Sequence, residues 1–197
     1  MEYAIIAGVN GVGKSTLFNA GHFEIDTNSV RVNSDELIHQ EYNNNWQDEV
    51  IQIKAGKEIL KLVQNCISKN ISFNQETTLA GKNILRSIIK VKELGYCISL
   101  HYVGLESPDL AIERVHQRVE KGGHGIDEKI IRERYVKSFV NLREILPLCD
   151  NINIYDNTQS LYTVLTVRER KIKYLNDNIP TYFSDIINYI KKLYDYK

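Results

Sequence analysis

The sequence predicts an α/β domain whose mainly parallel sheet carries helices on both faces and is followed by a C-terminal hairpin and helix. Strand-like runs alternate with amphipathic helical runs along the chain, as in a sheet whose strands are joined by helical crossovers. The first run, residues 3–8, is short, apolar and closed by a glycine, which is typical of a buried parallel strand. The chain has 197 residues, three prolines, no visible linker and no internal repeat, so we expect residues 1–197 to form one domain.

Each expected element has a local signal in the sequence. The expected strands are residues 3–8, 29–33, 71–76, 96–103 and 151–155, with a hairpin over 163–175. The expected helices are residues 15–20, a short helix beginning at Ser34, 48–69, 82–94, 107–121 and 127–146, and a last helix opened by Pro180. Ser34 and Ser107 are expected to cap their helices, and Gly95 is expected to end the helix before it.

The composition excludes several function classes. Lys plus Arg and Asp plus Glu number 25 each, so the chain lacks the basic surplus that duplex DNA or an anionic membrane requires. We therefore expect neither a nucleic-acid nor a membrane partner, and no run approaches the roughly 18 apolar residues of a membrane span. The three cysteines are odd in number and far apart, so they indicate neither a disulfide framework nor a zinc site. A reducing cytoplasm fits this usage best.

The strongest motif is Gly8-Val9-Asn10-Gly11-Val12-Gly13-Lys14-Ser15-Thr16, which matches the GxxxxGK[ST] pattern of a phosphate loop, the Walker A motif. The glycines let the loop turn with its N–H groups around phosphate oxygens, Lys14 reaches the β and γ phosphates, and the Ser15 hydroxyl can ligate Mg²⁺. The match lies between an expected strand and an expected helix, whose positive end also favours phosphate. The sequence therefore predicts a P-loop NTPase-type three-layer fold that binds a nucleoside triphosphate and Mg²⁺.

Asp35 follows the second expected strand, at the sheet edge where α/β folds bind their ligands. A kinase that acts on a hydroxyl needs a carboxylate to orient that hydroxyl and accept its proton, and Asp35 can serve as this base. An acid in the first turn of a helix is also favoured by the helix dipole alone. Glu36 is the rival acid, but it points about 100° away around the helix, so only one of the two can face the site.

Glu76, Thr77 and Thr78 are expected directly after the third strand. Glu76 can hold a Mg²⁺-bound water or a substrate hydroxyl, and the two threonines can donate to substrate oxygens. A strand end followed by a threonine that caps the next helix is the structural alternative. No apolar strand ends in the aspartate that holds Mg²⁺ in many P-loop proteins, so Glu76 and Asp35 are the candidates to replace it.

Arginines are concentrated around a glycine-rich break. Arg114 and Arg118 are four residues apart and share one helical face, and Arg132 and Arg134 follow on the next helix. Two helices joined by such a break can move as a lid, which we expect over about residues 114–134. Arginine suits the stabilisation of a transferring phosphoryl group, although surface pairing with Glu113 or Glu120 would also explain Arg118.

Taken together, these motifs resemble the zeta-toxin-like P-loop kinases, relatives of chloramphenicol phosphotransferase. The resemblance covers about residues 3–158, and its most specific segments are Glu76-Thr77-Thr78-Leu79-Ala80-Gly81, Arg114-Val115-His116-Gln117-Arg118-Val119-Glu120-Lys121-Gly122-Gly123-His124 and Asp156-Asn157-Thr158. It implies an ATP-dependent kinase with Asp35 as general base and Arg114, Arg118 and Arg134 as arginines that contact phosphate. It also implies that Asp156 and Asn157 belong to the nucleotide site. In zeta toxins the acceptor is a UDP-linked amino sugar, and a small antitoxin blocks the nucleotide site.

The hypothesis favoured by the sequence is an ATP-dependent kinase that phosphorylates a hydroxyl of a small molecule or nucleotide sugar. Its catalytic candidates are Lys14, Asp35, Arg118 and Arg134. Two alternatives remain open: a nucleoside or nucleotide kinase, and an ATP-binding switch or slow ATPase without an acceptor. The acid near an expected acceptor site favours the kinase, because an ATPase needs a group that positions water instead.

Overall fold

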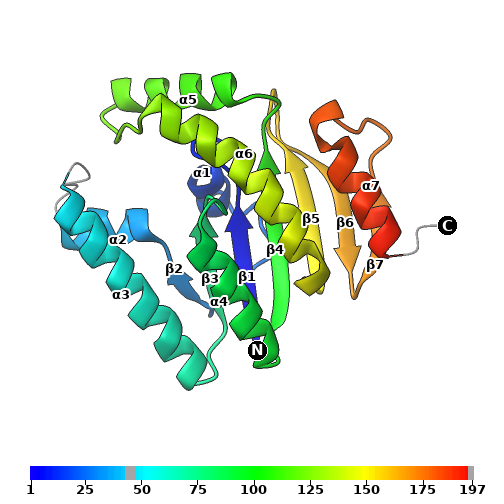
Figure 1. Cartoon of the computed structure of the whole chain (residues 1–197), viewed down its shortest axis with the longest axis horizontal. Helices are drawn as coiled ribbons and strands as arrows, with labels where there is room; N and C mark the ends of the chain where they lie inside the picture. The colour runs from blue at the N-terminus through cyan, green and yellow to red at the C-terminus, as the bar shows by residue number, and fades with distance from the viewer. Residues whose placement is uncertain (43–47, 195–197) are drawn as a thin grey trace.

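The computed structural model describes residues 1–42 and 48–194 and contains a seven-stranded sheet of order β2-β3-β1-β4-β5-β6-β7 (Figure 1). The strands are β1 (Glu2–Ala7), β2 (Val30–Val32), β3 (Phe73–Thr77), β4 (Cys97–Gly104), β5 (Asn151–Asp156), β6 (Tyr162–Arg168) and β7 (Lys171–Leu175). The first five strands pair in parallel, whereas β6 and β7 are antiparallel additions at one edge. The mainly parallel sheet and the C-terminal hairpin predicted from the sequence are therefore confirmed.

Seven α-helices occur among the described residues. They are α1 (Lys14–Asn19), α2 (Ser34–Glu41), α3 (Glu49–Ser68), α4 (Lys82–Glu93), α5 (Pro108–Glu120), α6 (Glu128–Ile145) and α7 (Ser184–Leu193). Pro180 precedes a short 3-10 turn, Thr181–Phe183, and α7 begins only after it, so the last helix starts later than expected. None of the helices within these described ranges is long and apolar enough to cross a bilayer.

Alternation along the strands divides the core between the two faces of the sheet. Tyr3 and Ile5 of β1 are buried in one core with residues of α3, α4, α6 and α7. Ile6 lies in a second core with Leu17 of α1 and Val115 of α5. Figure 1 shows α4 and α6 in front of the sheet and α1 behind it. Helices thus flank both faces, in the three layers that the sequence predicted.

The start of α2 corrects one expectation. The helix cap is Asn33 rather than Ser34: Asn33 has extended dihedrals, and its side-chain oxygen accepts from the Asp35 N–H at 2.9 Å. An asparagine caps as well as a serine, and here it stands one residue closer to β2. The cap at Asn33 fixes the backbone of Asp35 directly beside the end of β2.

The carboxyl ends of the neighbouring parallel strands bring the predicted motifs to one edge of the sheet. Gly8 follows β1 and Asn33 follows β2. Glu76 and Thr77 are the last two residues of β3, so the strand ends at Thr77, one residue beyond the expected 71–76. Since β1 and β3 are parallel neighbours with Ile6 opposite Glu76, the phosphate loop and Glu76 lie side by side.

Candidate active site

The phosphate loop depends on glycine at two tight backbone crossings. Gly8 has φ +142°, and a Cβ there would lie 2.3 Å from the carbonyl oxygen of Val103. A Cβ on Gly11 would lie 2.5 Å from the carbonyl oxygen of Ala111. No other residue fits at either position without moving backbone. The loop is thereby wedged between the end of β4 and the first turns of α5.

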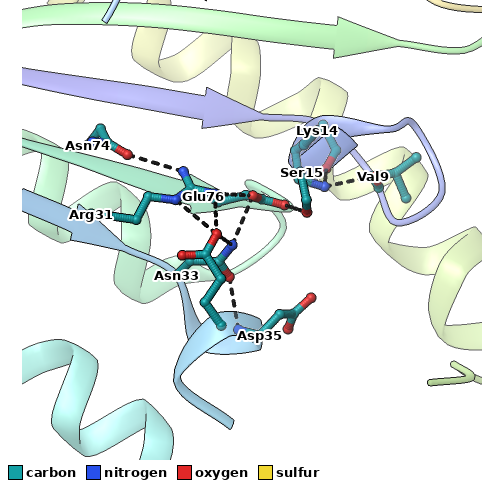
Figure 2. A network of polar contacts seen from close by, with 10 residues as sticks. Val9, Lys14, Ser15, Arg31, Asn33, Asp35, Asn74 and Glu76 are labelled. Atoms are coloured by element: carbon teal, nitrogen blue, oxygen red, sulfur yellow. Dashed lines mark hydrogen bonds and ion pairs between the residues drawn. The ribbon is translucent and has the colours of Figure 1, made fainter. Parts of the chain in front are cut away.

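Lys14 begins α1 and turns back under the loop (Figure 2). Its side chain is buried, and Nζ donates to the carbonyl oxygens of Gly8 at 2.8 Å and Val9 at 3.2 Å. Burial lowers the pKa of Lys14, and the negative charges of Glu76 and Asp35 oppose that shift. Among residues 1–42 and 48–194, the hydrogen-bond partners of the ammonium are therefore backbone oxygens of the loop, an arrangement that suits a phosphate-binding lysine.

Ser15 and Glu76 supply the oxygens beside the loop. The Ser15 hydroxyl donates to Glu76 Oε1 at 2.8 Å. Hard oxygen donors of this kind suit Mg²⁺, which takes few protein ligands and completes its shell with phosphates and water. No group of three or more His, Cys, Asp or Glu side chains suited to a metal occurs among residues 1–42 and 48–194. The Ser15 and Glu76 oxygens therefore suit a Mg²⁺ ion that is also bound by a nucleotide.

Glu76 is held from its other side by residues that the sequence analysis missed. Arg31 donates to Glu76 Oε2 at 2.6 Å, and the Asn33 side-chain amide donates to the same oxygen at 3.0 Å. Arg31 also bonds Glu36 and Asn74, so it joins α2 to β3 (Figure 2). The available signal was Arg31 itself, a charged residue between two valines in a short strand.

A cation–π contact with Phe18 also helps to fix the Arg31 side chain. Its guanidinium carbon lies 3.7 Å from the centre of the Phe18 ring on α1. Stacking on a ring and forked bonding to carboxylates are both properties of arginine that lysine lacks. Arg31 therefore links α1, α2 and β3 through one planar group, on a side chain that is 17% exposed.

Asp35 points away from the Glu76 cluster (Figure 2) and lines a cavity together with Lys14 and Arg134. Burial lowers the pKa of Arg118 and of Arg134, and the carboxylate of Asp35 counters both shifts. Asp35 is thus the negative charge that faces the cationic end of this cavity. Glu36, the rival acid, bonds Arg31 instead.

The arginines of the expected lid have different partners. Arg134 donates to the side-chain oxygen of Asn10 in the phosphate loop at 2.9 Å. Arg118 donates to the backbone oxygen of His124 at 2.8 Å, which folds the α5–α6 connection back on α5, and it has no ion pair with Glu113 or Glu120 among the described residues. Arg132 pairs with Asp109 at the surface, away from the loop.

Arg114 is hydrogen-bonded to the segment 156–158, and this segment is hydrogen-bonded to the phosphate loop. Arg114 donates to the Thr158 carbonyl at 2.8 Å, and the Asn157 amide donates to the Val12 carbonyl at 2.8 Å. The buried Asp156 carboxylate accepts from the Thr158 N–H and the Tyr182 hydroxyl. Asn157 therefore touches the phosphate loop directly, whereas Asp156 holds the turn that presents it.

The cavity beside Asp35 has a volume of about 560 Å³. It is bounded by the end of β3, by α2 and α3, and by the α5–α6 connection, and it includes Glu76, Thr77 and Thr78. Thr77 Oγ1 accepts from the Leu79 N–H at 3.0 Å, so it shapes the turn after β3. Seven of the expected site residues therefore meet around one space: Asn10, Lys14, Asp35, Glu76, Thr77, Thr78 and Arg134. The other expected residues of the phosphate loop, and Arg114, Arg118, Asp156 and Asn157, do not line it.

The fold and this loop define a P-loop nucleotide-binding protein of kinase type. The Zeta toxin family model matches residues 2–174, so the chain belongs to the zeta toxin family. The resemblance inferred from the motifs is confirmed by this match.

Three relatives extend the comparison. A Haemophilus influenzae protein, described only as uncharacterized, is 34% identical over 128 residues, which are 65% of this chain and 88% of that protein. A chain from the PezAT chromosomal toxin–antitoxin system of Streptococcus pneumoniae is 20% identical with a TM-score of 0.59, over 100% of this chain and 80% of that chain. A chain of the Pnkp1/Rnl/Hen1 RNA repair complex is 19% identical with a TM-score of 0.53; the match covers 73% of this chain and 45% of that one. These two structures share the fold.

Proposed function

We propose that this protein is an ATP-dependent kinase that transfers the γ-phosphoryl group of ATP to a hydroxyl group of a small molecule. Its family and fold support a P-loop kinase-type function. The observation that carries the proposal further is that Asp35 and the phosphate-loop lysine, Lys14, line one cavity. A carboxylate opposite the phosphates, with room for an acceptor between them, is the arrangement that transfer to a hydroxyl requires.

In the proposed reaction the acceptor hydroxyl lies between Asp35 and the γ-phosphate. The bond from the γ-phosphorus to the β–γ bridging oxygen breaks, the bond to the acceptor oxygen forms, and the hydroxyl proton passes to the Asp35 carboxylate. The loop N–H groups and Lys14 hold the phosphates, and Arg118 and Arg134 neutralise charge on the transferring group. Ser15 and Glu76 would hold Mg²⁺, which offsets the charge of the phosphates when bound.

The alternative functions differ in which molecule must lie opposite the γ-phosphate of bound ATP. A switch or slow ATPase needs only a water in that place, whereas the cavity here offers about 560 Å³ beside Asp35. A nucleoside kinase remains one case of the same chemistry, with a nucleoside hydroxyl as acceptor. The cavity favours a kinase over an acceptor-free switch.

The test is transfer of label from γ-labelled ATP with Mg²⁺ to a panel of hydroxyl-bearing metabolites, with the native protein and with Asp35→Asn. Asp35→Asn removes the proton acceptor and nearly conserves shape, so transfer should fall by about 10²-fold or more. ATP affinity should change by less than about tenfold, because Asp35 makes no bond to the phosphate loop.

Ser107→Ala is the structural control, because it removes the cap of α5 at a residue that neither lines the cavity nor bonds Glu76. It should lower stability by about 1 kcal/mol. Full transfer activity in Asp35→Asn, or ATP hydrolysis with no acceptor in the panel phosphorylated, would reject the kinase proposal in favour of the slow ATPase.

The likeness to a chain from a toxin–antitoxin system supports a second proposal, a small protein partner of antitoxin type. Such a partner would cover the nucleotide side and should compete with ATP. Co-purification of this protein with the product of a short neighbouring reading frame, together with loss of ATP binding in the complex, is the expected result. Full ATP binding in a stable complex would place the partner elsewhere.

A further inference from the structure

The positive charges that line the cavity are confined to the side of the phosphate loop. Among the described residues that line it, fixed positive charge comes from Lys14 and Arg134. Both are bound to the phosphate loop, Lys14 through the Gly8 and Val9 carbonyls and Arg134 through Asn10. These cations therefore lie where the phosphates of ATP would be held, and not at the far end of the cavity.

The other polar groups of the lining are mainly acidic, amide or hydroxyl in character. The carboxylates of the lining are Asp35, Glu76 and Asp127. Its amide and hydroxyl groups come mainly from Gln52, Gln75, Thr77 and Thr78. Burial and then the charge of Arg118 lower the pKa of His124, which disfavours the charged form of this ring. A diphosphate or carboxylate bound away from the phosphate loop would meet no arginine or lysine among the described lining residues, whereas proteins bind such groups with these side chains.

One wall of the cavity is apolar and lies on α3. Gln52, Ala55, Gly56 and Ile59 are spaced i, i+3, i+4 and i+7, so they share one helical face. Ile38 of α2 and the isoleucines of the α5–α6 side, Ile126 and Ile130, extend this surface. A ligand with one C–H face and one edge of hydroxyl groups matches an apolar wall opposite carboxylates and amides.

Gly56 leaves this wall open. It lies in the interior of the 20-residue helix α3, where glycine is less favourable than almost any other residue. A Cβ at Gly56 would have no heavy atom within 4 Å, so no neighbouring group requires a glycine there. A side chain at position 56 would therefore extend into the open space along the α3 wall of the cavity.

We propose that the acceptor is a small hydroxyl compound without anionic groups and with one apolar face, of the kind that free sugars and cyclitols provide, and that Gly56 keeps its site open. The inference rests on the proposed kinase function, since it describes the acceptor of that reaction. It distinguishes this chain from an enzyme for nucleotide-linked sugars, whose diphosphate would require cations at the acceptor end.

The first test compares matched acceptors that differ in anionic groups: N-acetylglucosamine with UDP-N-acetylglucosamine, glucose with glucose 6-phosphate, and myo-inositol with its monophosphate. Label transfer from γ-labelled ATP should give at least one uncharged compound a kcat/KM more than tenfold above that of its anionic partner. A preference for the anionic member of the pairs would overturn the inference and leave the kinase proposal intact. Transfer to no member of any pair, with ATP bound, would instead contradict the kinase proposal on which the inference rests.

The second test grades the side chain at position 56 with Gly56→Ala, Gly56→Val and Gly56→Phe. The KM for the accepted compound should rise with side-chain size, and in Gly56→Val it should rise at least tenfold more than the KM for ATP. Lys57→Val is the matched control, since it places the same β-branched residue on an exposed neighbouring position that does not line the cavity. Equal KM values for the acceptor in Gly56→Phe and the native protein, both folded by circular dichroism, would overturn the role of Gly56.

Discussion

The phosphate loop and the cavity beside Asp35 lie at the same sheet edge but are built in opposite ways. The loop comes from one continuous segment, residues 8–16, whose backbone carbonyls accept from Lys14 and whose backbone N–H groups are the expected partners of phosphate. The cavity is lined by side chains from α2, α3, β3 and the α5–α6 connection, which are far apart in the chain. A function carried by backbone is local in sequence, whereas one carried by side chains depends on how the whole fold is assembled.

The two regions also differ in how their charges are satisfied. At the loop, Lys14 has backbone oxygens as its direct partners, so its charge is available to phosphate. At the cavity edge, Glu76 is bonded by Ser15, Arg31 and Asn33 together. We therefore expect substitutions in the loop to affect use of ATP, and substitutions around Glu76 and α3 to affect the position of the acceptor and of Mg²⁺.

The largest effect is expected at Lys14. Lys14→Ala removes the ammonium that serves the β and γ phosphates, and phosphoryl transfer should fall by about 10³-fold or more. The fold should persist, because the Lys14 ammonium bonds only the carbonyls of Gly8 and Val9 and no ion pair is broken. Steady-state kinetics and thermal melting measure the two outcomes separately.

Lys173→Ala, an exposed lysine on β7, is the control for loss of a positive charge and should leave transfer unchanged. If Lys14→Ala melts far below the native protein, Lys14 has a structural role and the contrast between the two regions weakens. If Lys14→Ala turns over normally, the loop does not serve ATP.

A smaller effect is expected at Arg31, which belongs to the cavity side. Arg31→Lys keeps the charge but cannot bond Glu36, Glu76 and Asn74 at once or stack on Phe18. We expect kcat to fall about tenfold and stability to fall by about 1–3 kcal/mol, since a largely buried network loses partners. Because Glu76 would be less firmly held beside Ser15, the Mg²⁺ concentration for half-maximal activity should rise several-fold.

Arg132→Lys is the matched control, because Arg132 makes one exposed ion pair with Asp109. It should change neither stability nor Mg²⁺ dependence measurably. If Arg31→Lys loses stability but keeps the native Mg²⁺ dependence and kcat, then Arg31 supports the fold without positioning Glu76.

The sequence predicts the local features of this structure well, and it predicts less well the features that depend on the assembled fold. The order of strands and helices is recognisable, because periodicity, caps such as Ser107 and breaks such as Gly95 act over a few residues. The α2 cap at Asn33 and the inclusion of Thr77 in β3 were missed, since neighbouring polar residues compete on nearly equal terms for a boundary. Element boundaries are decided by pairing that the local sequence does not record.

The residues of the candidate site also differ in how well the sequence predicts them. The phosphate loop is predicted whole by its motif, and Asp35 by its place after a strand. Arg31 and Gly56 have no local signature of function: one is a charge in a short strand, and the other is a glycine in a helix. Their roles follow only once β2 pairs with β3 and α3 lies beside β2 (Figure 1).

The smallest effect is expected at Asn157, which lies on the nucleotide side but outside the phosphate-loop motif. Its amide donates to the Val12 carbonyl at 2.8 Å, and its nitrogen lies 3.1 Å from the position that a Cβ on Gly13 would occupy. Asn157→Ala removes one neutral hydrogen bond, worth about 1 kcal/mol, so the KM for ATP should rise about fivefold. The KM for the acceptor should change less than twofold, because Asn157 does not line the cavity. Asn176→Ala removes a comparable amide-to-backbone bond in the β6–β7 region and should move neither KM. An equal rise in both KM values for Asn157→Ala would show that the loop and the cavity are one mechanical unit, and the separation argued from their construction would then be wrong.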